Sequence, residues 1–465
     1  MKKKFVVLLE FCFFIGFGQL TPAQVPSYCW PEEPEVLRKL DQWQDQKFGM
    51  LIHWGLYSIP GIVESWSICS EEEDWIPRDS ACSYEAYKKW YWNLINDFNP
   101  TCFNPEQWAE TAKEAGMRYV IFTTKHHDGF NMFNTAYSEF SIAKGPFGNN
   151  PRSDVAKYVF DAFRQKNFMI GAYFSKPDWH SEYYWWPRYA TPRRSENYNI
   201  EKNPWRWEQF KTFTYNQLSE LMHNYGPLDI LWLDGGWVNV PGRKSRLDMP
   251  RIAEMARRAQ PGILIVDRMI QGKYENYQTP EQQIPDTLLP HPWETCMTLS
   301  DNWGYVPEAK YKSPELIVSR LIEIVAKGGC LALGVGPTPE GLLPEEAVEC
   351  LHTIGEWLNR NGKAIYSTRP ASPYQNNGVW FTRSKDRKTY YALYAKPEEQ
   401  KFPAYIEWEN HVPRTGSKII CLQNGKKVKW EKRGQRVRIR LPKDLNTPIH
   451  ALAFAFLPEN PAITE

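Results

Sequence analysis

The sequence has almost no net charge and no block of basic residues, although 24% of its residues are charged. Lysine and arginine number 56 against 54 aspartates and glutamates, which gives a formal charge of +2. Proteins that bind nucleic acids need a concentrated positive surface to neutralise phosphates. The sequence therefore predicts no nucleic-acid partner.

Long hydrophobic runs are missing beyond the N-terminus, since no later segment approaches the ~18 apolar residues of a membrane-spanning helix. Lys2, Lys3 and Lys4 precede an apolar run at 5–18 that only Glu10 interrupts, and small residues follow at 21–23. This pattern is typical of a secretory signal peptide. We expect residues 1–23 to be removed, and the chain to be exported to the periplasm or the extracellular space without membrane insertion.

Cys-x-x-Cys pairs and histidines at the spacing of zinc ligands are also absent, although the chain contains nine cysteines. Without a Cys-x-x-Cys or a His-spaced pair, the sequence does not favour a zinc site. Export permits disulfides, and Cys69 with Cys82 is the pair that we expect. Cys330 lies in an apolar segment and is expected to be buried and inert.

Apolar and aromatic residues are plentiful: 42% of the chain is hydrophobic, with 21 tryptophans and 25 tyrosines. This composition supports a full core and excludes a disordered chain. Tryptophan and tyrosine often stack on sugar faces, but they fill large cores equally well. A length of 465 residues fits one large catalytic domain with a smaller partner domain.

Between about residue 47 and residue 361, apolar strands alternate with helices. Strands are predicted at 47–53, 119–124, 169–174, 228–233, 263–266 and 330–333. Helices are predicted at 105–116, 154–165, 208–225, 250–258, 313–327 and 344–361. This alternation predicts a parallel sheet, and the length favours a (β/α)₈-like barrel over residues 24–360. No Gly-x-Gly-x-x-Gly fingerprint follows the first strand, so a dinucleotide cofactor is not expected.

The pattern changes after residue 360. Short strands are predicted at 380–382, 390–394, 418–421, 437–441 and 451–457. Turn signals such as Asn424-Gly425 separate them. This pattern of short strands separated by turns predicts a small C-terminal β-sandwich over residues 361–465.

Polar and aromatic residues gather where the predicted barrel strands end, which is where barrel enzymes carry their active sites. They are His53, His126, His127, Tyr173, Trp232, Asp234 and Arg268. Any one of them could simply satisfy a loop backbone, but together they favour a shared polar and aromatic pocket.

Asp234 is the most distinctive of these residues, because it ends the apolar run 228–233 and precedes two glycines. A buried carboxylate with space in front of it suits a nucleophile that attacks an anomeric carbon. The alternative is a structural helix cap. The run His126-His127-Asp128 could suggest a metal, but neighbouring residues on a strand face opposite sides. Neutral imidazoles that bind sugar hydroxyls fit better, and no metal is expected.

Four segments resemble the signatures of retaining α-L-fucosidases, glycoside hydrolase family 29. They are 47–55, 125–130, 231–235 and 292–296, and the resemblance extends from about residue 42 to residue 336. It implies a (β/α)₈-like barrel and removal of terminal α-L-fucose through a covalent fucosyl-enzyme. It also implies a fucosylated oligosaccharide or glycoconjugate as substrate, and no cofactor.

By matching position, Asp234 resembles the family nucleophile. The positions that resemble substrate ligands are His53, Glu64, Trp66, His126, His127, Tyr173, Trp232, Arg268 and Trp303. In this chain Ser65 is inserted between Glu64 and Trp66, which are adjacent in many members. Cys296 matches the cysteine of the Trp-Glu-x-Cys pattern, and no adjacent base gives it a nucleophilic role.

The general acid/base has two candidates. Glu281 lies 13 residues after Arg268 in a loop rich in glutamine and proline, which could reach over the pocket. Glu294 belongs to the Trp-Glu-x-Cys motif, which could be structural. We favour Glu281. Two other functions stay open from the sequence: another exported barrel glycosidase, such as an α-galactosidase, and a catalytically inactive glycan-binding protein.

Overall fold

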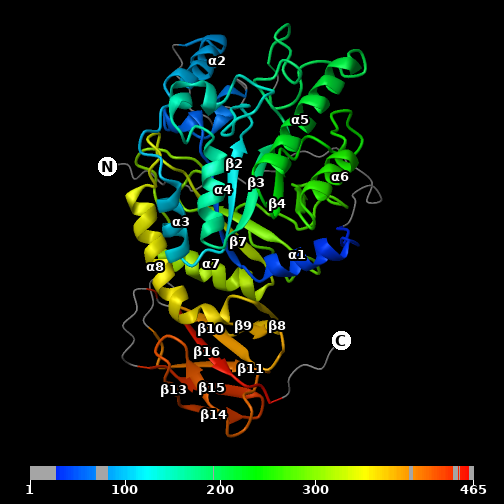
Figure 1. Ribbon diagram of the computed structural model, residues 1–465. Helices are drawn as coiled ribbons and strands as arrows, with labels where there is room; N and C mark the ends of the chain where they lie inside the picture. Colours follow the sequence, from blue (N-terminus) through cyan, green and yellow to red (C-terminus); the bar gives the residue numbers. More distant parts are fainter. Residues whose placement is uncertain are drawn as a thin grey trace, which may run out of the picture.

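The computed structural model describes residues 28–69, 82–191, 193–396, 402–442, 449 and 451–459. The expected signal peptide, residues 1–23, lies outside them. An α/β domain comes first in the chain, and an antiparallel β domain follows it (Figure 1). The predicted fold class is therefore confirmed. No helix of the described residues is long and apolar enough to cross a membrane.

Seven parallel strands form one sheet in the order β5-β4-β3-β2-β1-β7-β6. Their bounds are β1 (Phe48–Ile52), β2 (Tyr119–Lys125), β3 (Met169–Ser175), β4 (Ile230–Asp234), β5 (Leu264–Asp267), β6 (Glu294–Thr298) and β7 (Cys330–Val335). Every residue in these strands is buried, as expected for a parallel sheet covered on both faces. β2 points away from the C-terminal domain, so the carboxyl ends of the strands lie at the far end of the molecule (Figure 1).

An irregular segment, residues 274–282, connects the two edge strands of this sheet. On one side the Asn276 N–H donates to the Ile265 carbonyl at 2.8 Å. On the other side the Glu294 N–H donates to the Gln278 carbonyl, and the Gln282 N–H to the Cys296 carbonyl, both at 2.8 Å. The predicted barrel is thus closed by seven described strands, with this segment in place of an eighth.

The helices of the α/β domain are α1 (Pro34–Gln44), α2 (Tyr84–Asn93), α3 (Pro105–Glu114), α4 (Val155–Gln165), α5 (Pro204–Asn224), α6 (Met249–Ala259), α7 (Pro314–Ala326) and α8 (Glu345–Asn361). Short 3₁₀ turns lie between them: η2 (Leu56–Ser58), η3 (Ser65–Ile68), η4 (Leu94–Asn96), η5 (Ile142–Lys144), η6 (Pro146–Asn149) and η7 (Gly362–Ala364). Side chains of Asn104, Asp248 and Ser313 cap the starts of α3, α6 and α7, and proline occupies the first turn of each.

The barrel interior beneath the site is filled with aromatic side chains. The rings of Trp43 and Tyr277 stack with centroids 4.0 Å apart, and those of Tyr173 and Trp232 with centroids 5.2 Å apart. Gly49 leaves the space that Tyr119 occupies, since a Cβ at Gly49 would lie 2.4 Å from that ring. The interior therefore forms a dense floor rather than a pore.

The C-terminal domain consists of two antiparallel sheets around a common core. The larger sheet contains β8 (Thr368–Asn376), β9 (Val379–Ser384), β10 (Tyr390–Ala395), β12 (Ile419–Cys421), β13 (Lys427–Val428) and β16 (Ala451–Phe456). The smaller contains β11 (Tyr405–Glu409), β14 (Trp430–Arg433) and β15 (Arg436–Arg440). Phe381 and Phe454 from the larger sheet share one apolar cluster with Trp408 and Ile439 from the smaller.

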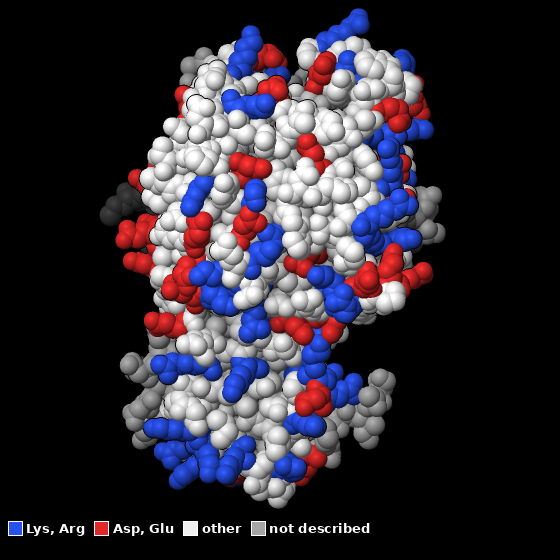
Figure 2. Space-filling view, in the orientation of Figure 1, with Lys and Arg blue, Asp and Glu red and all other residues white. Residues whose placement is uncertain are grey.

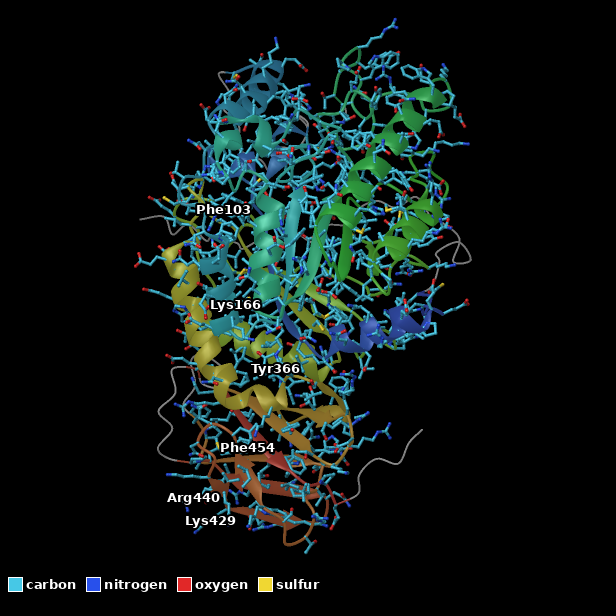
Figure 3. The ribbon with its side chains drawn as sticks, in the orientation of Figure 1. Phe103, Lys166, Tyr366, Lys429, Arg440 and Phe454 are labelled. Carbon is cyan, nitrogen blue, oxygen red and sulfur yellow. The ribbon has the colours of Figure 1, made fainter. Side chains whose placement is uncertain are left out.

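The charges are unevenly distributed between the two domains. Acidic and basic side chains are mixed over the α/β domain in Figure 2, whereas lysine and arginine gather at the free end of the β domain. Lys429 and Arg440 lie at this end (Figure 3). The near-zero charge of the whole chain therefore conceals a basic end.

The expected disulfide between Cys69 and Cys82 is wrong, because the structure does not join these two residues. Cys69 is fully buried, whereas Cys82 is half-buried beside the start of α2. Cys330 is buried as predicted, and burial raises the pKa of its thiol to about 12. This disfavours the reactive thiolate.

Candidate active site

A cavity of about 560 Å³ lies at the carboxyl ends of the barrel strands. It is lined by the site residues expected from the sequence, with the exception of Glu294. These are His53, Glu64, Trp66, His126, His127, Tyr173, Trp232, Asp234, Arg268, Glu281, Cys296 and Trp303. The parallel sheet brings them together because each strand ends at the same side.

Asp234 ends β4 and lies on the cavity floor among hydrogen-bond donors. The Tyr173 hydroxyl donates to its Oδ2 at 2.6 Å, and Arg268 Nη1 donates to its Oδ1 at 2.8 Å. Burial alone would raise the pKa of Asp234, but Arg268, His127 and the Tyr173 hydroxyl hold it well below its usual range. Asp234 is therefore an ionised carboxylate at neutral pH.

The three histidines of the cavity are uncharged at neutral pH. Burial lowers the pKa of His53 to about 3 and of His127 to about 4, and it also lowers the pKa of His126 well below its usual value. Hydroxyls orient two of the rings: Ser65 Oγ lies 2.6 Å from His126 Nδ1, and Ser175 Oγ lies 2.8 Å from His127 Nδ1. A neutral imidazole offers one donor and one acceptor, which suits a sugar hydroxyl.

Arg268 connects the two carboxylates of the cavity. Its Nη1 binds Asp234, while its Nη2 contacts Glu281 Oε2. Trp303 Nε1 also donates to Glu281 Oε1 at 3.1 Å. The Glu281 side chain is 41% exposed, so it stands at the edge of the cavity where a ligand can reach it.

Glu294, the other candidate, lies in the barrel interior. It is the first residue of β6, is fully buried, and accepts a hydrogen bond from Trp232 Nε1 at 3.2 Å. Burial raises its pKa to about 7. Glu294 supports Trp232 from beneath and does not line the cavity.

Glu64 and Trp66 both line the cavity despite the inserted Ser65, which itself contacts His126. Glu64 is buried, and its Oε1 accepts the N–H groups of Trp303 at 3.0 Å and Gly304 at 2.9 Å. Burial raises the pKa of Glu64 to about 7. Glu64 therefore fixes the turn that carries Trp303.

Cys296 lies behind Arg268, with its Sγ 3.7 Å from Nη2. Burial raises the pKa of this thiol far above its usual value, so the thiolate needed for nucleophilic attack is disfavoured. In the part of the chain that the structure describes, no group of three or more His, Cys, Asp or Glu residues could hold a metal ion.

Sequence reasoning missed the residues at the mouth of the cavity. They are Arg194, Trp237, Val240, Pro241, Arg243 and Met269. Except for Met269, they belong to the long loops after β3 and β4. No motif or periodicity marks these positions, because a loop's path depends on the folded barrel beneath it.

The cavity lies at the carboxyl ends of the barrel strands, where barrel enzymes carry their active sites, and it holds the two carboxyl groups that a glycoside hydrolase needs. Residues 18–363 match the family model described as alpha-L-fucosidase. The chain therefore belongs to the α-L-fucosidase family, glycoside hydrolase family 29, and its enzymatic activity is that of an α-L-fucosidase.

Several relatives extend this comparison. The chain is 31% identical to the plasma alpha-L-fucosidase of Homo sapiens over 77% of each chain. It is 28% identical to the tissue alpha-L-fucosidase of Bos taurus, over 92% of this chain and 91% of the relative. The structure of alpha-L-fucosidase isoenzyme 1 from Paenibacillus thiaminolyticus has a TM-score of 0.76 and 27% identity, over 92% of this chain and 100% of that one.

The depressed histidine pKa values predict a pH-dependent stability. Between pH about 6.5 and about 3 the unfolded chain binds a proton at His53 that the folded chain does not bind, so the contribution of His53 to stability falls as the pH falls. Because the pKa of Glu64 is raised, its contribution to stability instead falls as the pH rises above about 4.5. Because these two effects oppose each other, the contribution of His53 is best isolated by comparing a His53 variant with the wild type.

Urea unfolding of the wild type and of His53→Gln should be measured from pH 4 to pH 7.5. As the pH falls, we expect the free energy of unfolding of the variant to rise relative to that of the wild type by roughly a few kcal/mol. Exposed His352→Gln is the matched control. Parallel curves for wild type and His53→Gln would contradict an uncharged His53.

Proposed function

We propose that the protein is an exo-acting, retaining enzyme that removes terminal α-L-fucose from fucosylated oligosaccharides or glycoconjugates by double displacement. The observation that supports this most directly is the pair Asp234 and Glu281, bound to the two ends of the Arg268 guanidinium. Retaining glycosidases hold their two carboxyl groups ~5–5.5 Å apart. A single shared guanidinium is suited to setting such a separation.

In the first displacement Asp234 attacks the anomeric carbon of fucose, and the bond to the leaving oxygen breaks. Glu281 donates its proton to that oxygen, and a covalent fucosyl ester of Asp234 results. In the second displacement Glu281 accepts a proton from the water that attacks the same carbon. Fucose leaves, Asp234 is regenerated, and two inversions give net retention.

The rest of the cavity fits one terminal sugar. The buried side chains of Leu51, Tyr173 and Trp232 close its floor, so a glycan enters by its end. His53, His126 and His127 are placed to bind hydroxyls as neutral imidazoles. Trp303 offers an apolar face for the C5 methyl group of fucose, and its ring centroid lies 5.2 Å from that of His53.

Export of the chain is part of this proposal. It is supported by the basic and apolar N-terminal pattern and by similarity to a relative named for plasma.

The stereochemical course tests the proposal. Proton NMR during hydrolysis of an aryl α-L-fucoside should show α-L-fucose as the first product, before mutarotation. A panel of α1,2-, α1,3/4- and α1,6-fucosylated oligosaccharides should then identify the linkage that is cleaved, with an aryl α-galactoside as the comparison. Initial formation of β-L-fucose, or faster cleavage of the galactoside, would contradict the proposal.

Asp234→Gly should lose turnover by ~10⁴-fold or more while remaining folded, as for other covalent nucleophiles. Azide should partly restore cleavage of an activated α-fucoside and give a fucosyl azide of inverted configuration. Asp97→Ala, which changes an exposed carboxylate, is the control. Near-normal turnover by folded Asp234→Gly would remove this residue from the mechanism.

Glu281→Ala should impair oligosaccharide cleavage far more than cleavage of nitrophenyl fucoside, because a sugar alkoxide needs a proton to leave and nitrophenolate does not. A general acid contributes ~10²–10⁴-fold. Azide should rescue this variant with retained configuration. Glu294→Ala should lose activity similarly on both substrates, because it removes the hydrogen-bond acceptor of Trp232. The reverse pattern would assign the proton to Glu294.

A further inference from the structure

We propose that the mouth of the cavity selects fucosides whose leaving saccharide carries an anionic group, through Arg194 and Arg243. This inference rests on the proposed fucosidase function and extends it to the substrate class. Both arginines line the same cavity as Asp234 and Glu281, but they come from the loops after β3 and β4.

The charges of the cavity differ between its floor and its mouth. The positive charge of Arg268 is balanced by ion pairs with Asp234 and Glu281. Arg194 and Arg243 form no ion pair within 4 Å with any carboxylate of the described residues. Glu196 lies near enough for its charge to interact with that of Arg243, but the two form no ion pair within 4 Å. The mouth therefore keeps positive charge available for a ligand.

Arg194 is held in place rather than free in solvent. Its carbonyl accepts hydrogen bonds from Trp179 Nε1 at 3.2 Å and the Tyr184 hydroxyl at 2.9 Å. Its guanidinium lies over the ring of Trp237, 5.1 Å from the centroid. Stacking on an aromatic face leaves the guanidinium edge free to bind an anion.

The wall that carries Arg194 is continuous with the fucose pocket. Trp237 Nε1 donates to the Tyr184 hydroxyl at 3.1 Å, and the Trp237 ring lies 5.0 Å from that of His127. Burial is the main cause of the low pKa of His127, and the positive charge of Arg194 lowers this pKa further. A saccharide bonded to fucose at the floor would therefore pass close to Arg194.

Arg243 adds a second cation to the same mouth. It is exposed on the loop after β4, beside Val240 and Pro241, which also line the cavity. Met269, 63% exposed, adds apolar surface. Apolar faces and guanidinium donors together suit a sugar ring that bears a carboxylate or a sulfate, because arginine binds such groups with paired hydrogen bonds.

The test compares matched oligosaccharides of one fucosyl linkage whose leaving sugar is neutral, carboxylated or sulfated. The wild type should cleave the anionic members with a kcat/KM about 10-fold higher at about 20 mM salt, and the preference should shrink at about 500 mM salt. Arg194→Gln and Arg243→Gln should each reduce the anionic-to-neutral ratio roughly 3-fold to 10-fold. Arg433→Gln, on β14 with a 76% exposed side chain, should leave the ratio unchanged.

The outcomes separate the two proposals. Equal kcat/KM for neutral and anionic members, or a preference that survives both arginine substitutions, would overturn this inference and leave the fucosidase proposal intact. Failure of the wild type to cleave even nitrophenyl α-L-fucoside would overturn the proposed function itself. A preference for only the carboxylated or only the sulfated member would support the inference and identify the anion.

Discussion

The buried guanidinium of Arg268 is the interaction on which the site depends. It binds Asp234 at one end and Glu281 at the other, and its carbon lies 4.8 Å from the centroid of Trp232. Trp232 is in turn held by Glu294. A buried charge is stable only with partners, so this side chain needs both carboxylates. The two carboxylates are in turn held in place by Arg268, which directly follows β5.

Much of this arrangement could be predicted from the sequence, because strands that are buried on both faces read as apolar runs. The ends of those runs predict the positions of His53, Asp234 and Arg268 at the site. β6 was not predicted, since Glu294–Thr298 is mostly polar in sequence and is buried only because the barrel surrounds it. The helices α1 and α2 were also missed, and α5 begins at Pro204 rather than Glu208.

Other parts could not be predicted because they depend on contacts between distant segments. The two glutamates are 13 residues apart in sequence, yet one faces the cavity and the other lies in the interior. The path of residues 274–282 places Glu281 at the cavity, whereas strand β6 places Glu294 in the interior. Likewise, the inserted Ser65 is compatible with Glu64 and Trp66 at the cavity because a short 3₁₀ turn (η3) accommodates it. Arg194 reaches the mouth on a loop without a pattern.

The irregular segment between β5 and β6 has a consequence for how such an enzyme can change over time. Asp234 belongs to strand β4, in which an insertion of one residue would turn every following side chain to the other face of the sheet. Glu281 sits on backbone tied to its neighbours at only a few points. Insertions and deletions there can be absorbed without breaking strand register. The position of Asp234 is thus bound to one place in the chain, while the position of Glu281 can shift along it.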